Sequence, residues 1–206
     1  MAQVKILAAA CVALAALAAT GGAQAAACAT FGSVSAGTSS TSDVTYNGGD
    51  SDACVISEVN PQQGGGNTSG FDPAWGSGWS VLATVDSSGN ITNSSDFGVS
   101  LTGVPGTSGS WTLTSDQGAT LDLVFAMHAS NASGAFLFDD LSLVSGGTGT
   151  WEINWLNKGG NVPNYSNLTL FTRDVVVTPP VPEPETYALM LAGLAAVGFV
   201  ARRRKV

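Results

Sequence analysis

The sequence has little positive charge outside its two ends. Only 7 of its 206 residues are Lys or Arg, against 15 Asp or Glu, and the formal net charge is −8. Lys158 and Arg173 are the only basic residues between Lys5 and Arg202. Phosphate groups are bound by clustered Lys and Arg, so the middle of the chain is not suited to nucleic acid or to an anionic membrane surface.

Histidine is also scarce, and this restricts catalysis. The single histidine, His128, follows the apolar run 124–127, and no Gly-x-Ser-x-Gly elbow accompanies it. We therefore expect no catalytic residue, no cofactor and no enzymatic activity. The alternative, an exported hydrolase, would need a carboxylate pair drawn from Asp139, Asp140 and Glu152. Adjacent strand residues point to opposite faces, so a bulge or turn is favoured at Asp139-Asp140.

Of the 3 cysteines, Cys11 lies in the N-terminal segment, and Cys28 and Cys54 remain. We expect these two to pair in an oxidising compartment. A bridge that closes this loop stabilises a fold by roughly 3–4 kcal/mol. Zinc is disfavoured, because two cysteines and one distant histidine do not complete a four-ligand site without carboxylates.

Residues 1–27 have the pattern of a secretory signal peptide. Lys5 precedes a long run of Ala, Leu and Val, and Ala23-Gln24-Ala25 supplies the small residues of a cleavage site. Cleavage is predicted after Ala25 or Ala27. The alternative is an uncleaved N-terminal anchor.

Residues 28–178 predict an all-β ectodomain, a single jelly-roll-like β-sandwich. Apolar and polar residues alternate with a period of two in short runs such as 121–125 and 151–155, and Gly- and Asn-rich segments separate the runs. The Cys–Trp–Cys spacing of an immunoglobulin domain does not occur, which favours a jelly roll. Strands are expected near residues 43–47, 54–59, 79–86, 96–102, 109–115, 119–129, 134–144, 149–156 and 167–177.

Residues 179–206 combine a proline box, an uncharged apolar run and a basic end. Pro182 and Pro184 bias the residues before them toward extended geometry. The uncharged run 186–201 would form roughly 24 Å of helix, against a hydrocarbon core of ~30 Å. We expect it to be a transmembrane helix, retained and oriented by basic residues that snorkel to the cytoplasmic interface: Arg202, Arg203, Arg204 and Lys205.

This order of segments resembles the PEP-CTERM sorting signal of Gram-negative bacteria. The resemblance covers residues 181–206 and rests on the Val-Pro-Glu-Pro box, the Ala-Leu-Met-Leu-Ala-Gly-Leu run and the basic cluster. Glu185 departs from the family, which more often has Ser or a similar small residue there. The resemblance implies sorting by exosortase, a membrane-embedded transpeptidase-like enzyme with a cysteine nucleophile, through four residues: Val181, Pro182, Glu183 and Pro184. Family members are associated with exopolysaccharide production and biofilm or floc matrix.

Two further sites are weaker hypotheses. Asn47, Asp50 and Asp52 offer oxygen ligands suited to calcium in a Gly-rich loop, and the alternative is a solvated acidic loop. Trp75 and Trp79 offer aromatic faces on which sugar rings stack, and the alternative is packing in the core or in a turn.

Together these patterns predict an exported, non-enzymatic protein of the cell surface or extracellular matrix. It would be anchored transiently in the inner membrane and sorted by exosortase. The competing hypothesis is a carbohydrate-binding module for the cell's own exopolysaccharide.

Overall fold

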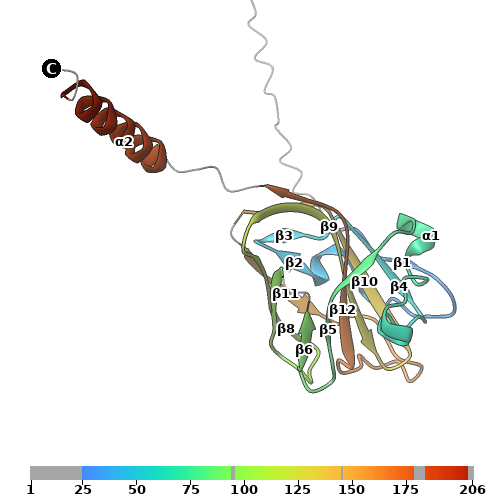
Figure 1. Ribbon diagram of the computed structural model, residues 1–206. Coiled ribbons are helices and arrows are strands. Elements are labelled where there is room, and N and C mark those ends of the chain that lie inside the picture. The colour runs from blue at the N-terminus through green and yellow to red at the C-terminus, as the bar shows by residue number, and fades with distance from the viewer. Residues whose placement is uncertain (1–24, 94–95, 145, 179–183, 204–206) are drawn as a thin grey trace, which may run out of the picture.

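The computed structural model describes residues 25–93, 96–144, 146–178 and 184–203 (Figure 1). β-Strands are the main regular structure of these residues, and the helix α2 (Pro184–Arg203) comes after the last strand. The prediction of an all-β fold for the middle of the chain is therefore confirmed. The predicted boundaries at 27–28 and 178–179 stay predictions, although Ala26 already forms hydrogen bonds with Thr41 and Ala27 lies opposite Ser40 in a β-bridge.

The larger sheet has seven strands in the order β1-β4-β10-β9-β12-β5-β6. All neighbouring strands are antiparallel except β1 and β4, which are parallel. β9 and β10 are joined by a two-residue turn in which Ser130 has a φ of 59°, the positive φ that short hairpins require. The strands are β1 (Ala29–Thr30), β4 (Ala53–Ser57), β5 (Ser80–Val85), β6 (Ile91–Asn93), β9 (Gly118–Ala129), β10 (Ala132–Leu143) and β12 (Asn167–Thr178).

The smaller sheet has three antiparallel strands in the order β11-β8-β7. These are β7 (Phe97–Leu101), β8 (Ser108–Ser115) and β11 (Gly147–Glu152). A two-stranded ribbon lies beside β11, where the Thr45 and Thr150 hydroxyls are 2.8 Å apart. The ribbon consists of β2 (Thr45–Tyr46) and β3 (Gly49–Asp50), and the short helices are η1 (Thr41–Asp43), η2 (Gln63–Gly65) and α1 (Asp72–Trp75).

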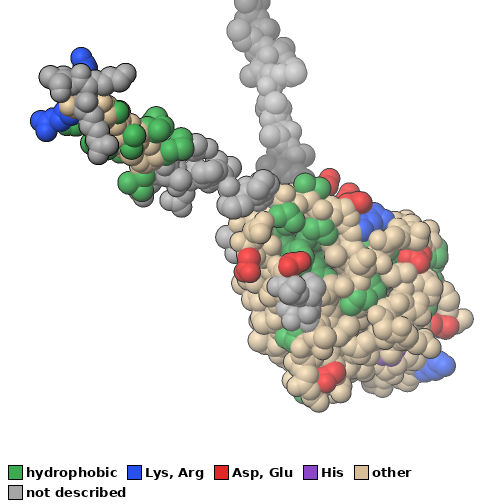
Figure 2. Space-filling view, viewed as in Figure 1, with side chains coloured by type: hydrophobic (Ala, Val, Ile, Leu, Met, Phe, Trp, Pro, Cys, Tyr) green, Lys and Arg blue, Asp and Glu red, His purple; other side chains and the backbone are tan. Residues whose placement is uncertain are grey.

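The visible surface of the sandwich carries scattered acidic side chains and few basic ones (Figure 2). This distribution agrees with the negative net charge of the sequence. The acidic groups on this face are dispersed, so the view shows no single strongly charged patch.

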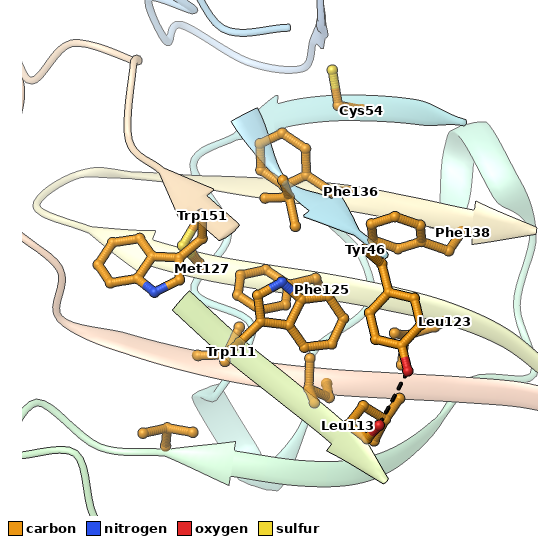
Figure 3. Close-up of a cluster of buried hydrophobic side chains, with 14 of the residues drawn as sticks. Tyr46, Cys54, Trp111, Leu113, Leu123, Phe125, Met127, Phe136, Phe138 and Trp151 are labelled. Carbon is orange, nitrogen blue, oxygen red and sulfur yellow. Dashed lines mark hydrogen bonds between the residues drawn. The ribbon is translucent and has the colours of Figure 1, made fainter. Parts of the chain in front are cut away.

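The core lies between the two sheets, because alternate side chains of β9 face the smaller sheet. Leu121, Leu123, Phe125 and Met127 of β9 are all at most 1% exposed. The Trp111 ring of β8 lies 4.9 Å from the Phe125 ring, between their centroids (Figure 3). Three of the buried aromatic side chains have partners for their polar groups: the Tyr46 hydroxyl donates to the Leu113 carbonyl at 3.1 Å, and the Trp111 and Trp151 indole N–H groups donate to the Thr45 and Thr102 carbonyls.

The opposite face of the larger sheet is covered by the connection between β4 and β5. Phe71 of this segment is 2% exposed, and its ring lies 5.3 Å from the Phe171 ring of β12. Val124 and Ala126 of β9 belong to the same cluster. The centre of β9 is therefore buried on both faces, which explains its uninterrupted apolar run at 123–127.

Each predicted strand range overlaps a strand of the structure, but the jelly-roll arrangement is wrong. A jelly roll divides eight strands into two Greek keys, whereas the larger sheet here has seven strands and the smaller sheet three. The alternation of residues gives the position of a strand and which residues share a face, but not the strand's neighbours. The strands that the sequence did not predict, β1, β3 and β6, have two or three residues, too few to show a period of two.

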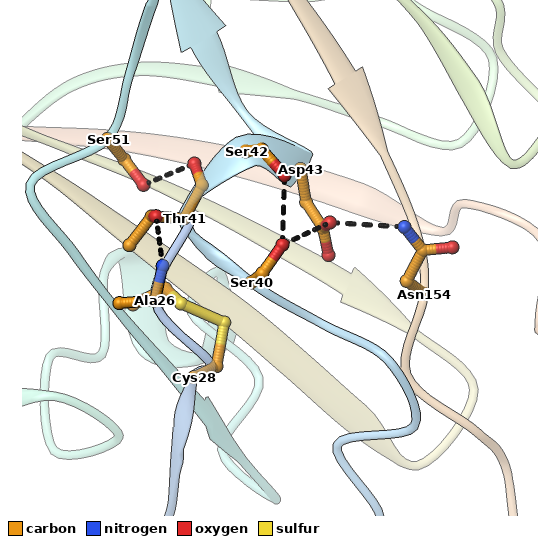
Figure 4. The surroundings of a disulfide bond; sticks show 9 residues. Ala26, Cys28, Ser40, Thr41, Ser42, Asp43, Ser51 and Asn154 are labelled. Carbon is orange, nitrogen blue, oxygen red and sulfur yellow. Dashed lines mark hydrogen bonds between the residues drawn. A yellow bond between two sulfur atoms is a disulfide. The ribbon is translucent and has the colours of Figure 1, made fainter. Parts of the chain in front are cut away.

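The predicted disulfide is confirmed. Cys28 and Cys54 are bonded, with their Cα atoms 4.7 Å apart (Figure 4). Both side chains are nearly buried, and they connect the start of the described chain to β4, next to the long central strands.

Replacing Trp111 by Ala tests the packing between the sheets. Because Trp111 is 1% exposed and contacts both Tyr46 and Phe125, we expect the free energy of unfolding to fall by about 3–5 kcal/mol. Urea unfolding followed by circular dichroism measures this change. The matched control is Val144→Ala, at a side chain that is 82% exposed, and its effect should stay within about 0.5 kcal/mol. Equal losses in the two variants would contradict the assignment of the core.

Candidate functional site at the C-terminal end

Strand β12 connects the core to the C-terminal segment. It pairs with β9 from Asn167 to Thr178, but with β5 only from Leu168 to Thr172. Beyond Thr172 it therefore has a strand neighbour on one side only, within the described part of the chain. The side chains of Val175, Val176 and Val177 are 41%, 64% and 50% exposed. The predicted sorting segment follows directly.

Arg173 fixes β12 where this exposed part begins. Its Nε donates to Oδ2 of Asp122 on β9 at 2.9 Å, and its Nη1 donates to the Trp75 carbonyl at 2.7 Å. The guanidinium carbon also lies 4.1 Å from the centre of the Trp79 ring, within the range of a cation–π contact. One side chain thus joins β12 to β9 and to the segment that covers the larger sheet.

Asp122 depends on this partner because it is 6% exposed. Burial alone would raise the pKa of its carboxyl, but hydrogen bonds from Arg173 and from the Asp140 backbone, with the charge of Arg173, lower that pKa below its ordinary value. The negative charge of Asp122 in turn raises the pKa of Asp139. The pKa values of Asp122 and Asp139 are therefore shifted in opposite directions.

Both strands beside β9 have a bulge near Asp122. The register of β10 shifts between Phe138 and Leu141, and that of β12 shifts between Arg173 and Val176. Asp140 and Asp174 have φ values of 51° and 52°, in the left-handed region that Asp enters more readily than most residues. The bulge predicted at Asp139-Asp140 is therefore confirmed.

Helix α2 contains most of the predicted sorting segment. It begins at Pro184, which suits the first turn of a helix, and it has Arg202 and Arg203 in its last turn. The side chains of residues 188–203 are exposed, and Figure 2 shows apolar groups along the helix and basic groups at its end. Residues 181–183, Arg204 and Lys205 lie outside the described residues, as does most of the predicted signal peptide, residues 1–24.

The prediction of a transmembrane helix is corrected. In the residues that the structure describes, no helix combines the length and the apolar character needed to cross a membrane. α2 has 20 residues, but Glu185, Arg202 and Arg203 lie within it, so its uncharged part is shorter than the helix.

Comparison with protein families identifies the C-terminal segment. Residues 180–205 match the family model of the PEP-CTERM protein-sorting motif. The chain carries a PEP-CTERM sorting motif. This match confirms the resemblance found in the sequence and indicates an exported protein that exosortase targets. The same comparisons found no match to a curated protein or to a solved structure.

The sandwich before the PEP-CTERM motif does not direct the three predicted calcium ligands to one point. The Asn47 side chain accepts from the Thr148 backbone at 3.1 Å, and the Asp52 carboxylate accepts from the Asp139 backbone at 2.8 Å, while Asp50 is exposed on β3. No group of three or more His, Cys, Asp or Glu among the described residues is placed to hold a metal ion. Calcium binding stays a prediction.

Trp75 and Trp79 take part in packing on the outer face of the larger sheet. Their rings lie 5.5 Å and 5.8 Å from the Phe71 ring, and the Trp79 indole N–H donates to the Gly76 carbonyl at 2.8 Å. Arg173 occupies a face of Trp79. Both tryptophans are half-buried, which favours the packing alternative over the sugar contact.

His128 is held by a neighbouring strand. Its Nδ1 lies 2.8 Å from the Ser133 hydroxyl of β10, and burial lowers the pKa of its imidazole. Ser133 is 4% exposed, so a substrate has little access to this hydroxyl. The pair therefore fits a structural role that links β9 to β10.

The carboxylates of the hydrolase alternative lie on different sheets. Asp139 and Asp140 occupy the β10 bulge, near Asp122, four residues after β9 begins. Glu152 pairs with Ser108 at the start of β8, at the end of that strand away from the turn into β9. The sequence did not lead to a predicted role for Arg173, although an isolated basic residue in an acidic domain was a usable signal.

Replacing Arg173 by Met tests the junction at the base of the C-terminal segment. Asp122 would stay buried without its cation, so we expect the free energy of unfolding at pH 7 to fall by about 2 kcal/mol, below the usual loss for a fully buried pair because Arg173 is 24% exposed. Arg173→Lys is the matched control: it keeps the charge, but its single ammonium group replaces a planar donor with several N–H groups, so its loss should be smaller.

The difference in the free energy of unfolding between the wild type and Arg173→Met should decrease as the pH falls. A carboxyl with a lowered folded-state pKa stabilises the fold above its unfolded pKa of about 4, and this contribution disappears as the pH falls through the lower folded value. The stabilities of the wild type and Arg173→Met, measured by urea unfolding, should therefore converge in acid. A constant difference from pH 7 down to pH 2 would contradict the role of Asp122.

Proposed function

We propose that the chain is an exported, non-enzymatic protein of the cell surface or extracellular matrix, whose C-terminal segment is processed by exosortase. The observation that carries this proposal is the PEP-CTERM match at 180–205, directly after the last strand of the sandwich. The C-terminal region would hold the chain at the membrane until exosortase acts. The predicted signal peptide at 1–27 would direct the chain to export.

The chemistry of the sandwich supports export. Its disulfide is of the kind that persists in oxidising compartments outside the cytosol. Its aromatic core, with rings from both sheets in contact, gives the domain a closely packed interior. Such a domain is suited to remain folded while its C-terminal segment is processed.

The non-enzymatic part of the proposal is supported by the contacts of the candidate catalytic groups. The hydroxyl beside His128 is buried, and Glu152 belongs to a different sheet from Asp139 and Asp140. Asp52 and Asp122 accept hydrogen bonds from the backbone at the β10 bulge, which is a structural use of these carboxylates. A role in the exopolysaccharide matrix follows only from the resemblance to other PEP-CTERM proteins.

The carbohydrate-binding alternative has less support. It needs open aromatic faces, and the faces of Trp75 and Trp79 are partly covered by Phe71 and Arg173. Binding of the producer's exopolysaccharide, lost in Trp75→Ala, would favour this alternative over a structural role of the ectodomain.

The experiment that tests the proposal is mass spectrometry of the mature C-terminus in cells with and without exosortase. We expect a C-terminus near Pro184 only when exosortase is present. An intact Val206 in both strains would contradict processing.

A pair of proline variants tests recognition. If Pro182 contributes one contact worth about 1.4 kcal/mol, Pro182→Ala lowers the rate of processing roughly tenfold. Pro179→Ala is the matched control, because this residue lies outside the matched range 180–205. The processed fraction over time is measured by the same mass spectrometry, and equal rates for the two variants would show that the proline box is not what exosortase reads.

A further inference from the structure

The last part of β12 has an unpaired edge. Its pairing with β5 ends at Thr172, whereas its pairing with β9 continues past the bulge to Thr178. Among the described strands, none pairs with residues 175–178 on the side where β5 would continue. Backbone N–H and C=O groups along such an edge can bind an added strand. In Figure 1 this end of β12 lies where the C-terminal segment leaves the sandwich.

A groove lies beside this edge. Its volume is about 300 Å³, and its apolar lining comes from Val175 and Val177 of β12 and from Phe97 at the start of β7. Asp96 and Asp116 line it as well. The groove thus combines apolar contact area with acidic groups.

The valines of the groove continue the core-facing row of the larger sheet into solvent. Val177 pairs with Ala119, which lies on the same face of β9 as Leu121 and Leu123. Leu121 and Leu123 are at most 1% exposed, but Val177 is 50% exposed. Exposed apolar side chains beside unpaired backbone groups are typical of a surface to which another chain adds a strand.

The charge of the groove argues against a second copy of this chain as its occupant. The formal net charge of the chain is −8, and the basic residues of the sandwich are Lys158 and Arg173. Arg173 is engaged by Asp122. Two copies joined at this edge would bring Asp96 and Asp116 of both grooves to one interface, and like charges across an interface are unfavourable. The groove instead fits an extended segment that has apolar side chains and a basic group.

The sorting motif itself offers few backbone donors to an enzyme. Positions 179, 180, 182 and 184 are prolines, which lack an N–H, so Val181 and Glu183 are the only residues from 179 to 184 that have one. An enzyme that binds this segment in extended form gains few main-chain hydrogen bonds there. The edge of β12 at 175–178, directly upstream, offers the unpaired backbone groups that the proline box lacks.

The groove lies within reach of any enzyme that holds the proline box. Val177 and Val181 are four residues apart, so their Cα atoms are at most ~14 Å apart even in a fully extended chain. This limit follows from the covalent chain alone. A separate partner in the groove would stand next to the bound enzyme, whereas a segment of the enzyme itself would make both contacts.

We propose that the β12 edge at 175–178 and the groove beside it form a second binding surface for exosortase, which lays an extended segment of its own along this edge. This inference rests on the processing proposed above. The proline box supplies specificity, the edge supplies main-chain hydrogen bonds, and Val175 and Val177 supply apolar contact. Asp116 faces a basic side chain of the enzyme. The sandwich is then part of the substrate that exosortase recognises.

The variant Val177→Lys tests this surface in the full-length chain, in cells that contain exosortase. A lysine on an edge strand is a common means of preventing strand addition. We expect the rate of processing to fall roughly tenfold, as for the loss of one good contact. The processed fraction over time is measured by mass spectrometry of the C-terminus, and the midpoint of urea unfolding should match that of the wild type.

The matched control is Val144→Lys, which adds the same charge at the same end of the sandwich. Val144 follows Leu143, which pairs with Ala119 as Val177 does, but it is not part of the groove. Its rate of processing should equal that of the wild type. Equal rates for Val177→Lys and the wild type, or equal losses in the two variants, overturn this inference alone. An intact Val206 in the wild type, with and without exosortase, overturns the proposed function as well.

Photo-cross-linking identifies the occupant of the groove directly. A photoreactive aromatic side chain is placed at position 177, or at position 144 as the control, in cells whose exosortase lacks its cysteine nucleophile and therefore holds its substrate. We expect an adduct with exosortase from position 177 and none from position 144. An adduct with a second copy of the chain in its place, or no adduct with exosortase from position 177, would overturn the inference.

Discussion

The contact between Trp111 and Phe125 joins the two sheets, and much of the architecture depends on it. Phe125 lies at the centre of β9, the middle strand of the larger sheet, and Trp111 lies at the centre of β8, the middle strand of the smaller sheet. Only two residues separate β8 from β9, so the chain passes directly from one sheet to the other. Gly149 of β11 lies against the Trp111 indole, and Cβ at that position would overlap the ring and the Thr45 backbone.

The second constraint is the scarcity of cations in an acidic domain. Arg173 is shared among Asp122, the Trp75 carbonyl and the Trp79 ring, so one side chain makes all of these contacts at the point where β12 loses its pairing with β5. Asp43, near the other end of the described chain, is buried, and the ion pairs of the described residues do not include it.

The positions of the strands were predictable, because a half-buried strand shows its period in the sequence. The run at 121–125 lies within β9, and the run at 151–155 overlaps the end of β11 at residues 151 and 152. The tail segment was identified from its order of proline box, apolar run and basic end. The jelly-roll prediction failed because alternation does not specify neighbours. The prediction for the tail helix failed differently: α2 forms, but no helix among the described residues is long and apolar enough to cross a membrane.

The sequence by itself determined the positions of the longer strands, the disulfide and the sorting motif. The strands and the motif depend on residue types at short spacing. The disulfide follows because only Cys28 and Cys54 remain to pair once Cys11 is assigned to the N-terminal segment. Only the tertiary structure decided that β12 lies between β9 and β5, that Arg173 meets Asp122 and Trp79, and that Ala26 reaches Thr41. These contacts join residues far apart in the chain, and the free energy that selects them comes from packing and charge compensation, which no local pattern records.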